Sequence, residues 1–294
     1  KHTRLVELLK SLNLGIFPQK LGEQAIYEWI STSPHQLVDL PENGEPSFRI
    51  RGGTAALIDA LAKEVPPEAL SLGEPVNAIT ASPEGLMVST QNKVFATGTV
   101  VSTLPPNLLL NTVTIEPELP GKLKEVMERT HTWMGESIKI GLRFRKPFWR
   151  EIDSSGTVFS NVGPVTELYD HASYADDFHA LKGFLNGAYA SVGREERKKV
   201  VLTQLRKYYG RQVEHVLGYH EAVWAHEPFT YAPYASHVMP HQYNGHAIYR
   251  EPFLDGKLFI AGLMPGLLTG IALMVTSYFI FGRTERNLST AKDF

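Results

Sequence analysis

The chain has 294 residues, of which 43% are hydrophobic, and it carries 29 basic and 31 acidic side chains. A chain of this length and apolar content buries a sizeable core, as one large domain or two of ordinary size. The near balance of charge gives no electrostatic footprint for nucleic acid. Cysteine is absent from the sequence, which excludes a disulfide framework and a thiolate metal site.

The first 61 residues contain two predicted helices with a mixed segment between them. Leucines at helical spacing predict a helix over roughly Thr3–Ser11, which Asn13 ends. Residues 19–46 are interrupted by prolines and a glycine, and residues 48–53 form a short extended run that ends in a glycine pair. Thr54 can cap a second helix that continues to about residue 61.

The middle of the chain reads as strands. Four short β-branched runs follow one another with turn residues between them, and this pattern predicts a meander over residues 76–80, 86–90, 94–97 and 99–103. Ile138–Phe144 is another strand candidate.

The second half mixes helix and strand. The charged, amphipathic stretch Arg194–Tyr209 predicts a surface helix, residues 219–224 and 257–261 predict strands, and an apolar helix is expected after the last strand. This order of elements predicts a mixed α/β (α+β) protein. We expect four segments along the chain, with boundaries at 1–50, 51–118, 119–224 and 225–294.

Residues 258–282 contain no charged side chain. The stretch is long enough to cross a bilayer, for which about 20 residues suffice, and Gly262, Gly266 and Gly270 have the small-xxx-small spacing of packed membrane helices. Pro265 and the glycines favour instead a buried strand, a turn and a buried helix. A cytoplasmic protein and one anchored in a membrane through residues 258–282 are the two alternatives.

Several segments resemble, in the same order, those of the flavin-containing monoamine oxidase family. The most specific is Gly135-Glu136-Ser137-Ile138-Lys139-Ile140, followed by Lys146-Pro147-Phe148-Trp149-Arg150. The others are residues 2–5 with 15–19, the helix entry 51–61, the strand 74–79, the strand and proline turn 100–106, and the strand 257–262.

The resemblance implies a fold and an activity. It implies part of an FAD domain with a β-meander, and a substrate domain with a mixed sheet and flanking helices. It also implies oxidative deamination of a primary or secondary amine, with non-covalently bound FAD as cofactor and O2 as acceptor.

Three residues are the candidates for the reaction site. The resemblance places Lys139 where a lysine bridges through water to the flavin N5, and a cation there favours the negative charge of the reduced ring. The strand pattern directs Lys139 to the face opposite Ile138 and Ile140. Trp224 matches a tryptophan that packs near the flavin, and Tyr234 matches one wall of an aromatic cage for the amine.

Three further positions match cofactor-binding segments of the family. The strand that contains Val76 corresponds to the one whose backbone meets the adenine. Gly262 corresponds to the entry of the last FAD motif, and Met274 lies within that motif. The histidines at 226, 237, 241 and 246 match no metal-ligand spacing, so no metal site is predicted.

The sequence departs from the family in three places. It contains no G-x-G-x-x-G fingerprint, so the N-terminal Rossmann unit that holds a dinucleotide is not among these residues. The segment from Lys20 to Arg51 is short where the family has much of a helical substrate domain, and residues 263–274 carry aliphatic side chains, with Ile271 at the second cage position. The alternatives are therefore a non-catalytic remnant or binding module, or one half of a split flavoenzyme whose partner chain supplies the dinucleotide-binding unit. A homodimer is a further option.

Overall fold

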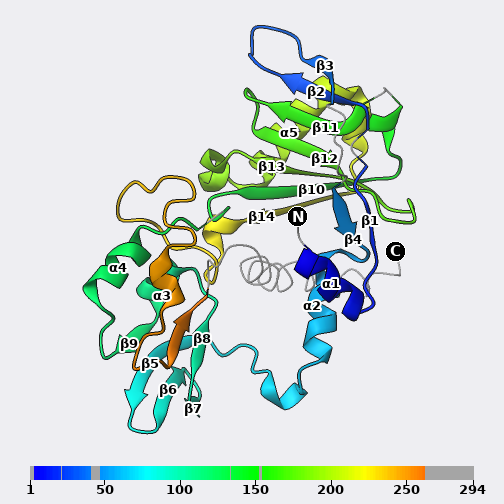
Figure 1. Ribbon diagram of the computed structural model, residues 1–294. Helices are drawn as coiled ribbons and strands as arrows, with labels where there is room; N and C mark the ends of the chain where they lie inside the picture. The colour runs from blue at the N-terminus through cyan, green and yellow to red at the C-terminus, as the bar shows by residue number, and fades with distance from the viewer. Residues whose placement is uncertain (1–2, 21, 41–46, 133, 152–153, 262–294) are drawn as a thin grey trace. The chain divides into compact units, whose positions relative to one another are not determined.

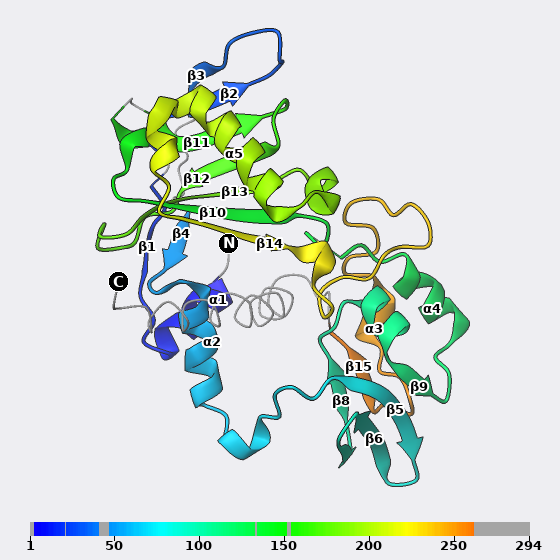
Figure 2. The ribbon, with the colours of Figure 1, turned by 180° about the vertical axis from the view of Figure 1, so that it is seen from behind.

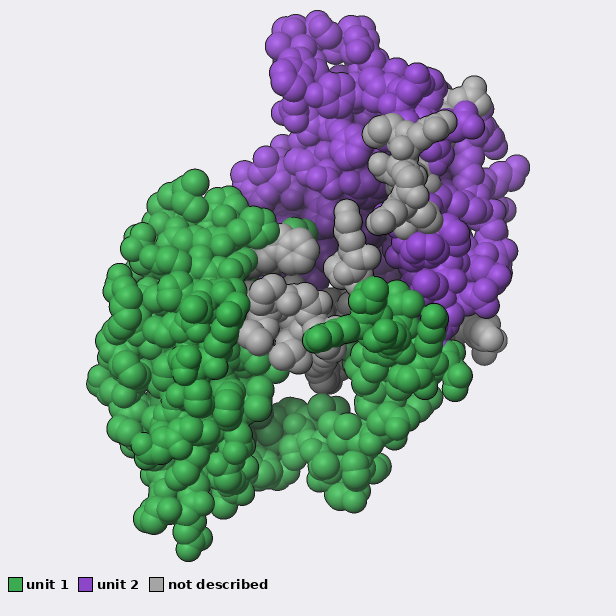
Figure 3. Space-filling view, in the orientation of Figure 1, with its two compact units in different colours: residues 1–13, 54–135, 225–294 green, residues 14–53, 136–224 purple. Residues whose placement is uncertain are grey.

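The computed structural model describes residues 3–20, 22–40, 47–132, 134–151 and 154–261 (Figure 1). The chain divides into two compact units (Figure 3). Unit 1 contains residues Lys1–Asn13, Thr54–Gly135 and Ala225–Phe294, and unit 2 contains Leu14–Gly53 and Glu136–Trp224.

Unit 2 is built on a seven-stranded sheet with the order β14-β10-β13-β12-β11-β2-β3. Neighbouring strands are antiparallel except β11 and β2, which are parallel. The strands are β2 (Gln24–Glu28), β3 (Gln36–Asp39), β10 (Ile138–Phe144), β11 (Ser154–Ser160), β12 (Val165–Asp170), β13 (His179–Leu185) and β14 (Gly218–Val223). A separate antiparallel pair joins β1 (Ile16–Pro18) to β4 (Phe48–Ile50). The mixed α/β fold class is confirmed.

Helix α5 (Arg194–Tyr209) lies across one face of this sheet (Figure 2). Strand residues alternate between the two faces, so Ile138, Ile140 and Leu142 all point into the core, where they are at most 2% exposed. Val201 and Leu205 of α5 belong to the same apolar cluster. The span predicted for α5 is confirmed, although polar side chains of this helix, among them Gln204, are also buried. The opposite face of the sheet, which we call the open face, carries Lys139.

A buried carboxylate joins β2 to α5 and β11. Glu28 is 2% exposed; it accepts hydrogen bonds from Tyr208 and Ser160 and forms an ion pair with Lys207. Burial acts to raise the pKa of Glu28, but the bonds from Lys207, Tyr208 and Ser160 outweigh it and hold that pKa below its usual value. The carboxylate is therefore charged at neutral pH and fixes the edge of the sheet to the helix.

Glu28→Gln is expected to lower the free energy of unfolding at pH 7 by about 1–3 kcal/mol, because a hydrogen-bonded buried charge is lost. A depressed carboxyl pKa contributes stability above the unfolded pKa of about 4.3, and that contribution disappears as the pH falls through the folded pKa. Urea unfolding at pH 7 and at lower pH checks this. An equal difference between variant and wild type at both pH values would contradict it.

Unit 1 contains a four-stranded sheet with the order β7-β6-β5-β9. The antiparallel run of β5 (Val76–Ser82), β6 (Gly85–Thr90) and β7 (Val94–Thr97) confirms the first three strands of the predicted meander. The fourth predicted strand is present as β8 (Val100–Ser102), but its place in the meander is wrong, because β8 pairs in parallel with β15 (Leu258–Ile260) instead. The position beside β5 is taken by β9 (Thr114–Glu116), also parallel.

The described residues of unit 1 also form four α-helices. They are α1 (Thr3–Ser11), α2 (Gly53–Lys63), α3 (Pro106–Thr112) and α4 (Gly121–Glu128). The first residue of α2, Gly53, belongs to unit 2. The span of α1 matches the sequence prediction. Leu109 of α3 and Leu123 and Met127 of α4 pack with Leu258 and Ile260 of β15 in one apolar core.

A search of the described residues finds no helix long and apolar enough to cross a membrane. Most of the uncharged C-terminal stretch, residues 262–282, lies outside the described residues, so the choice between a buried helix and an anchor stays a prediction.

Candidate active site

Lys139 lies on the open face of the unit 2 sheet, as the strand pattern predicts. It stands in β10 opposite Phe184 of β13 on one side and Ala222 of β14 on the other. Its Nζ is 5.8 Å from the centroid of the Phe184 ring and 5.6 Å from that of the Trp224 ring. The ammonium group is thus held between two aromatic side chains, an arrangement that retains a cation at low cost.

Burial lowers the pKa of Lys139. No hydrogen bond or ion pair of its ammonium occurs within the described ranges, so aromatic faces are its main electrostatic support. A half-buried ammonium without a carboxylate partner can donate its protons to a ligand.

Trp224 lies directly after β14 and is 3% exposed. Its backbone N–H donates to Ser137 O at 3.2 Å, which fixes it beside the start of β10. Its indole Nε1 is buried and meets no hydrogen-bond acceptor among the described residues. Leaving such a donor unpaired costs about 1–3 kcal/mol.

Together, the Lys139 ammonium and the Trp224 indole make a site rich in donors. Such a site fits a ligand edge that accepts hydrogen bonds, and the N5 side of a flavin ring, with its adjacent carbonyl oxygen, has that character. The residues present therefore fit a flavin.

Tyr234 belongs to unit 1, whereas Lys139 belongs to unit 2. The contacts of Tyr234 described below are with residues of unit 1. Its hydroxyl accepts a hydrogen bond from Thr132 N at 2.6 Å. Its ring meets Tyr231 edge-on at 5.7 Å and lies nearly parallel to His131 at 6.4 Å. The hydroxyl thus anchors the side chain, and the half-buried ring is the part left to contact a ligand.

Of the remaining predicted cofactor residues, Val76 is the one that lies within the described residues. Val76 begins β5 and is paired with Thr90 of β6. Gly262, Ile271 and Met274, with the whole altered segment 263–274, lie outside the described residues.

The open face also holds charged residues that the sequence pattern does not indicate. Lys182 of β13 stands opposite Tyr169 of β12, and the Tyr169 hydroxyl donates to Glu167 at 2.8 Å. Burial lowers the pKa of Lys182, and the nearby charges of Lys139 and Arg49 lower it further. Alternation along β13 would indicate Lys182 once that strand is recognised.

His171 follows β12 directly and is the neutral member of this group. Burial, with the neighbouring charges of Arg49 and Lys182, lowers its pKa to about 3. It therefore adds no charge at neutral pH.

Comparison with known proteins decides the family. The family model described as flavin containing amine oxidoreductase matches residues 32–264. The chain belongs to this family. The predicted resemblance is confirmed, and the family's cofactor is a flavin.

Curated relatives of the chain carry several substrate names. Putrescine oxidase of Kocuria rosea is 28% identical over 203 residues, which cover 64% of this chain and 42% of that protein. A probable flavin-containing monoamine oxidase A of Dictyostelium discoideum is 26% identical, covering 67% and 44%. An L-amino acid dehydrogenase of Synechocystis is 25% identical, covering 70% and 44%. The chain thus spans less than half the length of the curated relatives it matches.

Solved structures agree on the fold of the chain. Wild-type putrescine oxidase bound to putrescine superimposes with a TM-score of 0.75 at 18% identity, covering 95% of this chain and 86% of that one. Cyclohexylamine oxidase from Brevibacterium oxydans gives 0.75 at 18%, covering 93% and 86%. At these identities the likeness concerns the fold alone.

Two of the histidines singled out in the sequence, His237 and His246, make local contacts. His246 accepts a hydrogen bond from Ile248 N at 3.1 Å, and the His237 ring contacts the Met239 sulfur at 3.3 Å. Within the described ranges no group of three or more acidic or histidine side chains could hold a metal ion.

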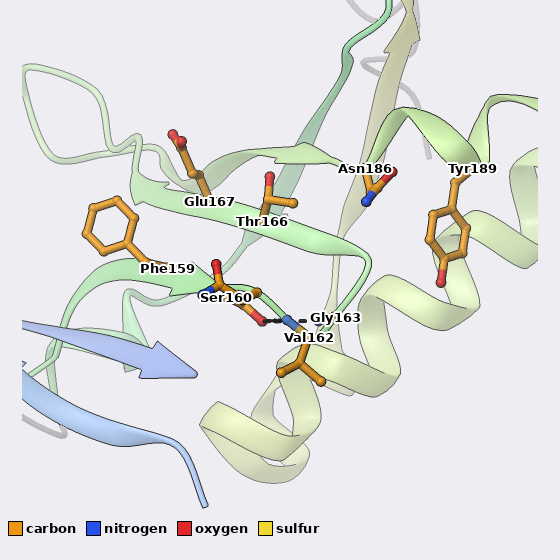
Figure 4. Close-up of a pocket in the computed structure, with 9 residues that line it drawn as sticks. Phe159, Ser160, Val162, Gly163, Thr166, Glu167, Asn186 and Tyr189 are labelled. Carbon is orange, nitrogen blue, oxygen red and sulfur yellow. Dashed lines mark hydrogen bonds between the residues drawn. The ribbon is translucent and has the colours of Figure 1, made fainter. Parts of the chain in front are cut away.

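A pocket of about 560 Å³ lies at the ends of β11 and β12 (Figure 4). Ser160 Oγ accepts from the backbone N–H groups of Val162 and Gly163, at 3.2 and 3.1 Å, and so shapes the turn on one side. None of the residues predicted for the site lines it. Glu167 connects it to the open face, since Glu167 stands opposite Phe184.

Proposed function

We propose that the chain forms the flavin-facing part of an FAD-dependent oxidoreductase that oxidises a primary or secondary amine, with O2 as electron acceptor. The observation that supports this most is the Lys139 ammonium, which has no hydrogen-bond or ion-pair partner among the described residues. It lies 5.6 Å from the centroid of the Trp224 ring, whose buried indole N–H also meets no described acceptor. When bound, the flavin supplies the hydride-accepting chemistry.

The protein side chains would act on charge and position. Lys139 places a positive charge where negative charge builds up on the reduced flavin. The Tyr234 ring is assigned as a wall of the amine-binding cage, where an electron-rich face attracts a cation. The strand begun by Val76, with segments 51–118 and 225–294, is assigned to flavin binding, and segment 119–224 to substrate binding.

The purified chain should bind FAD and become yellow, with an absorbance at about 450 nm that remains after desalting. An anaerobic amine should then bleach that absorbance. Protein that stays colourless after incubation with FAD would overturn the proposal for this chain by itself.

One observation favours a second candidate, a split flavoenzyme. The sequence contains no G-x-G-x-x-G loop, and such a loop normally places the pyrophosphate at a helix N-terminus. In a split flavoenzyme the colourless chain acquires flavin only when a separate chain with a dinucleotide-binding unit is present. Co-purification of such a chain distinguishes it from a non-catalytic remnant.

The Trp224 indole gives a direct test of the flavin contact. Trp224→Phe keeps an aromatic ring but removes the donor, and it should weaken FAD binding by about 2- to 10-fold, the value of one hydrogen bond. Trp29→Phe is the matched control, because the Trp29 side chain is 66% exposed. Equal affinities of the two variants in a fluorescence titration would exclude Trp224 from the flavin site.

A further inference from the structure

Two lysines of the open face border a common space. Lys139 stands opposite Phe184, and Lys182 lies two residues before Phe184 on the same strand, so both point to the same face. The residue opposite Lys182 is Gly141, two residues after Lys139. A Cβ at Gly141 would meet no atom within 4 Å. The absent side chain therefore leaves an open space between two lysine positions, Lys139 two residues away on the same strand and Lys182 directly across on β13, whose Nζ lies 6.0 Å from the centroid of the Tyr169 ring.

The charges around this space are mostly positive. Lys182 interacts electrostatically with Lys139 and Arg49, which repel it, and with Glu167, which attracts it. Arg49 is held in place by hydrogen bonds to the backbone of Ala172 and His171. Among the described carboxylates, Glu167 acts on Lys182 and Asp170 acts on Arg49, while neither lysine forms a hydrogen bond or ion pair within the described part of the chain.

The two described histidines of this face add no negative charge. His171 is neutral at physiological pH, because burial and the nearby cations depress its pKa. His220 of β14 stands on the other side of Gly141 and can add positive charge but not negative. An anionic group that entered the space would meet attraction from both lysines, while a second ammonium group would meet repulsion.

We propose that Lys182, with Lys139 and the open space over Gly141, forms a subsite for the carboxylate of an amino-acid substrate. The inference rests on the proposed function and specifies its substrate class: an amine that carries a carboxylate, not a diamine. The flanking rings of Phe184 and Trp224 suit an apolar or aromatic side chain on the same molecule.

Isothermal titration of the chain with three ligands of one skeleton, with and without FAD, tests the subsite. These ligands are phenylalanine, 3-phenylpropionate and phenethylamine. The two carboxylates should bind about tenfold more tightly than the amine, the effect of one charge-assisted hydrogen bond, and their affinity should fall as salt is raised. Binding of the amine as tight as that of the carboxylates, or binding of none of the three, would overturn the proposal.

Variants connect the effect to the named residues. Lys182→Met should weaken both carboxylates by about tenfold and leave the amine unchanged, whereas Lys182→Arg should keep the preference. Gly141→Val retains both charges, fills the open space and suits a strand, so it should also weaken the carboxylates. Lys199→Met is the control, because Lys199 lies on α5 with its side chain 73% exposed. Carboxylate affinity unchanged by Lys182→Met would refute the assignment.

The outcome is separable from that of the proposed function. If the carboxylates bind but the chain acquires no flavin spectrum, the subsite proposal stands and the proposed oxidase function is refuted. If Lys182 instead serves the flavin, Lys182→Met would weaken FAD binding and spare the carboxylates, which contradicts the subsite alone.

Discussion

Lys139→Met is expected to slow the reoxidation of bound flavin by O2 by about 10²–10³-fold, the cost of removing one preorganised group that stabilises developing charge. The variant keeps the length and apolar stem of the side chain between Phe184 and Trp224. Because the ammonium is half-buried and unpaired with any described carboxylate, its removal breaks no internal ion pair. The fold should therefore remain intact while the reaction with O2 fails.

Stopped-flow measurement of the dithionite-reduced, flavin-loaded protein mixed with O2 isolates this step from amine binding. Lys199→Met provides the surface control and should leave the rate unchanged. The structural role of Lys139 can be read separately from the denaturation midpoint. A variant that folds, binds flavin and reacts with O2 at the wild-type rate would show that Lys139 does not face the flavin.

Arg197→Met is expected to lower the free energy of unfolding by about 3–5 kcal/mol, the typical cost of removing one partner of a buried ion pair. Arg197 of α5 pairs with Glu221 of β14, and their side chains are 7% and 6% exposed. Burial acts to raise the pKa of Glu221, but hydrogen bonds from Arg197 and Tyr219 outweigh it and keep that pKa low. The variant leaves this charge buried without its cation.

The pH dependence follows from the depressed pKa of Glu221. The contribution of the pair is fully present above the unfolded carboxyl pKa of about 4.3 and is lost as the pH falls through the folded pKa. Urea unfolding should thus show the largest defect at neutral pH. The double variant Arg197→Met/Glu221→Leu should recover much of the loss.

Arg206 offers the matched comparison on the same helix. It pairs with Glu214 at 2.7 Å, but the side chains are 53% and 49% exposed. Arg206→Met should cost less than about 1 kcal/mol, because solvent screens exposed ion pairs. Similar losses for the Arg197 and Arg206 variants would contradict the role of burial.

The sequence predicts those elements whose pattern is local. The limits of α1, β7, β10 and α5 match the predicted spans, because periodic apolar residues and charged flanks define them. The orientation of Lys139 follows from alternation within β10 alone. Of these four elements, β10 carries a residue of the candidate site, Lys139.

The failures concern pairing and polar strands. β8 follows β7 directly, yet its partner β15 lies far along the chain, and a local pattern contains no information on such a partner. β12 and β13 place Glu167, Tyr169 and Lys182 on the open face, so their sequences lack the apolar content that marks a strand. Asp170 is buried because it accepts from Trp149 Nε1 and Arg150 Nε, both at 2.8 Å. Lys182 is not predicted because the strand that carries it, β13, is not recognised from the sequence.

The candidate residue of unit 1, Tyr234, could be predicted only in outline. Tyr234 is identified by resemblance, but its hydroxyl bond to Thr132 N depends on a loop that no periodicity describes. The same holds for the stacking of Tyr234 on His131.

A crystal structure of the chain soaked with FAD tests the central claim most directly. We expect the flavin ring to lie against the Trp224 side chain, with Lys139 Nζ one bridging water from N5 and the indole N–H donating to the ring edge. Flavin bound elsewhere in unit 2, with the Lys139 ammonium still free of contact, would contradict the role proposed for the open face.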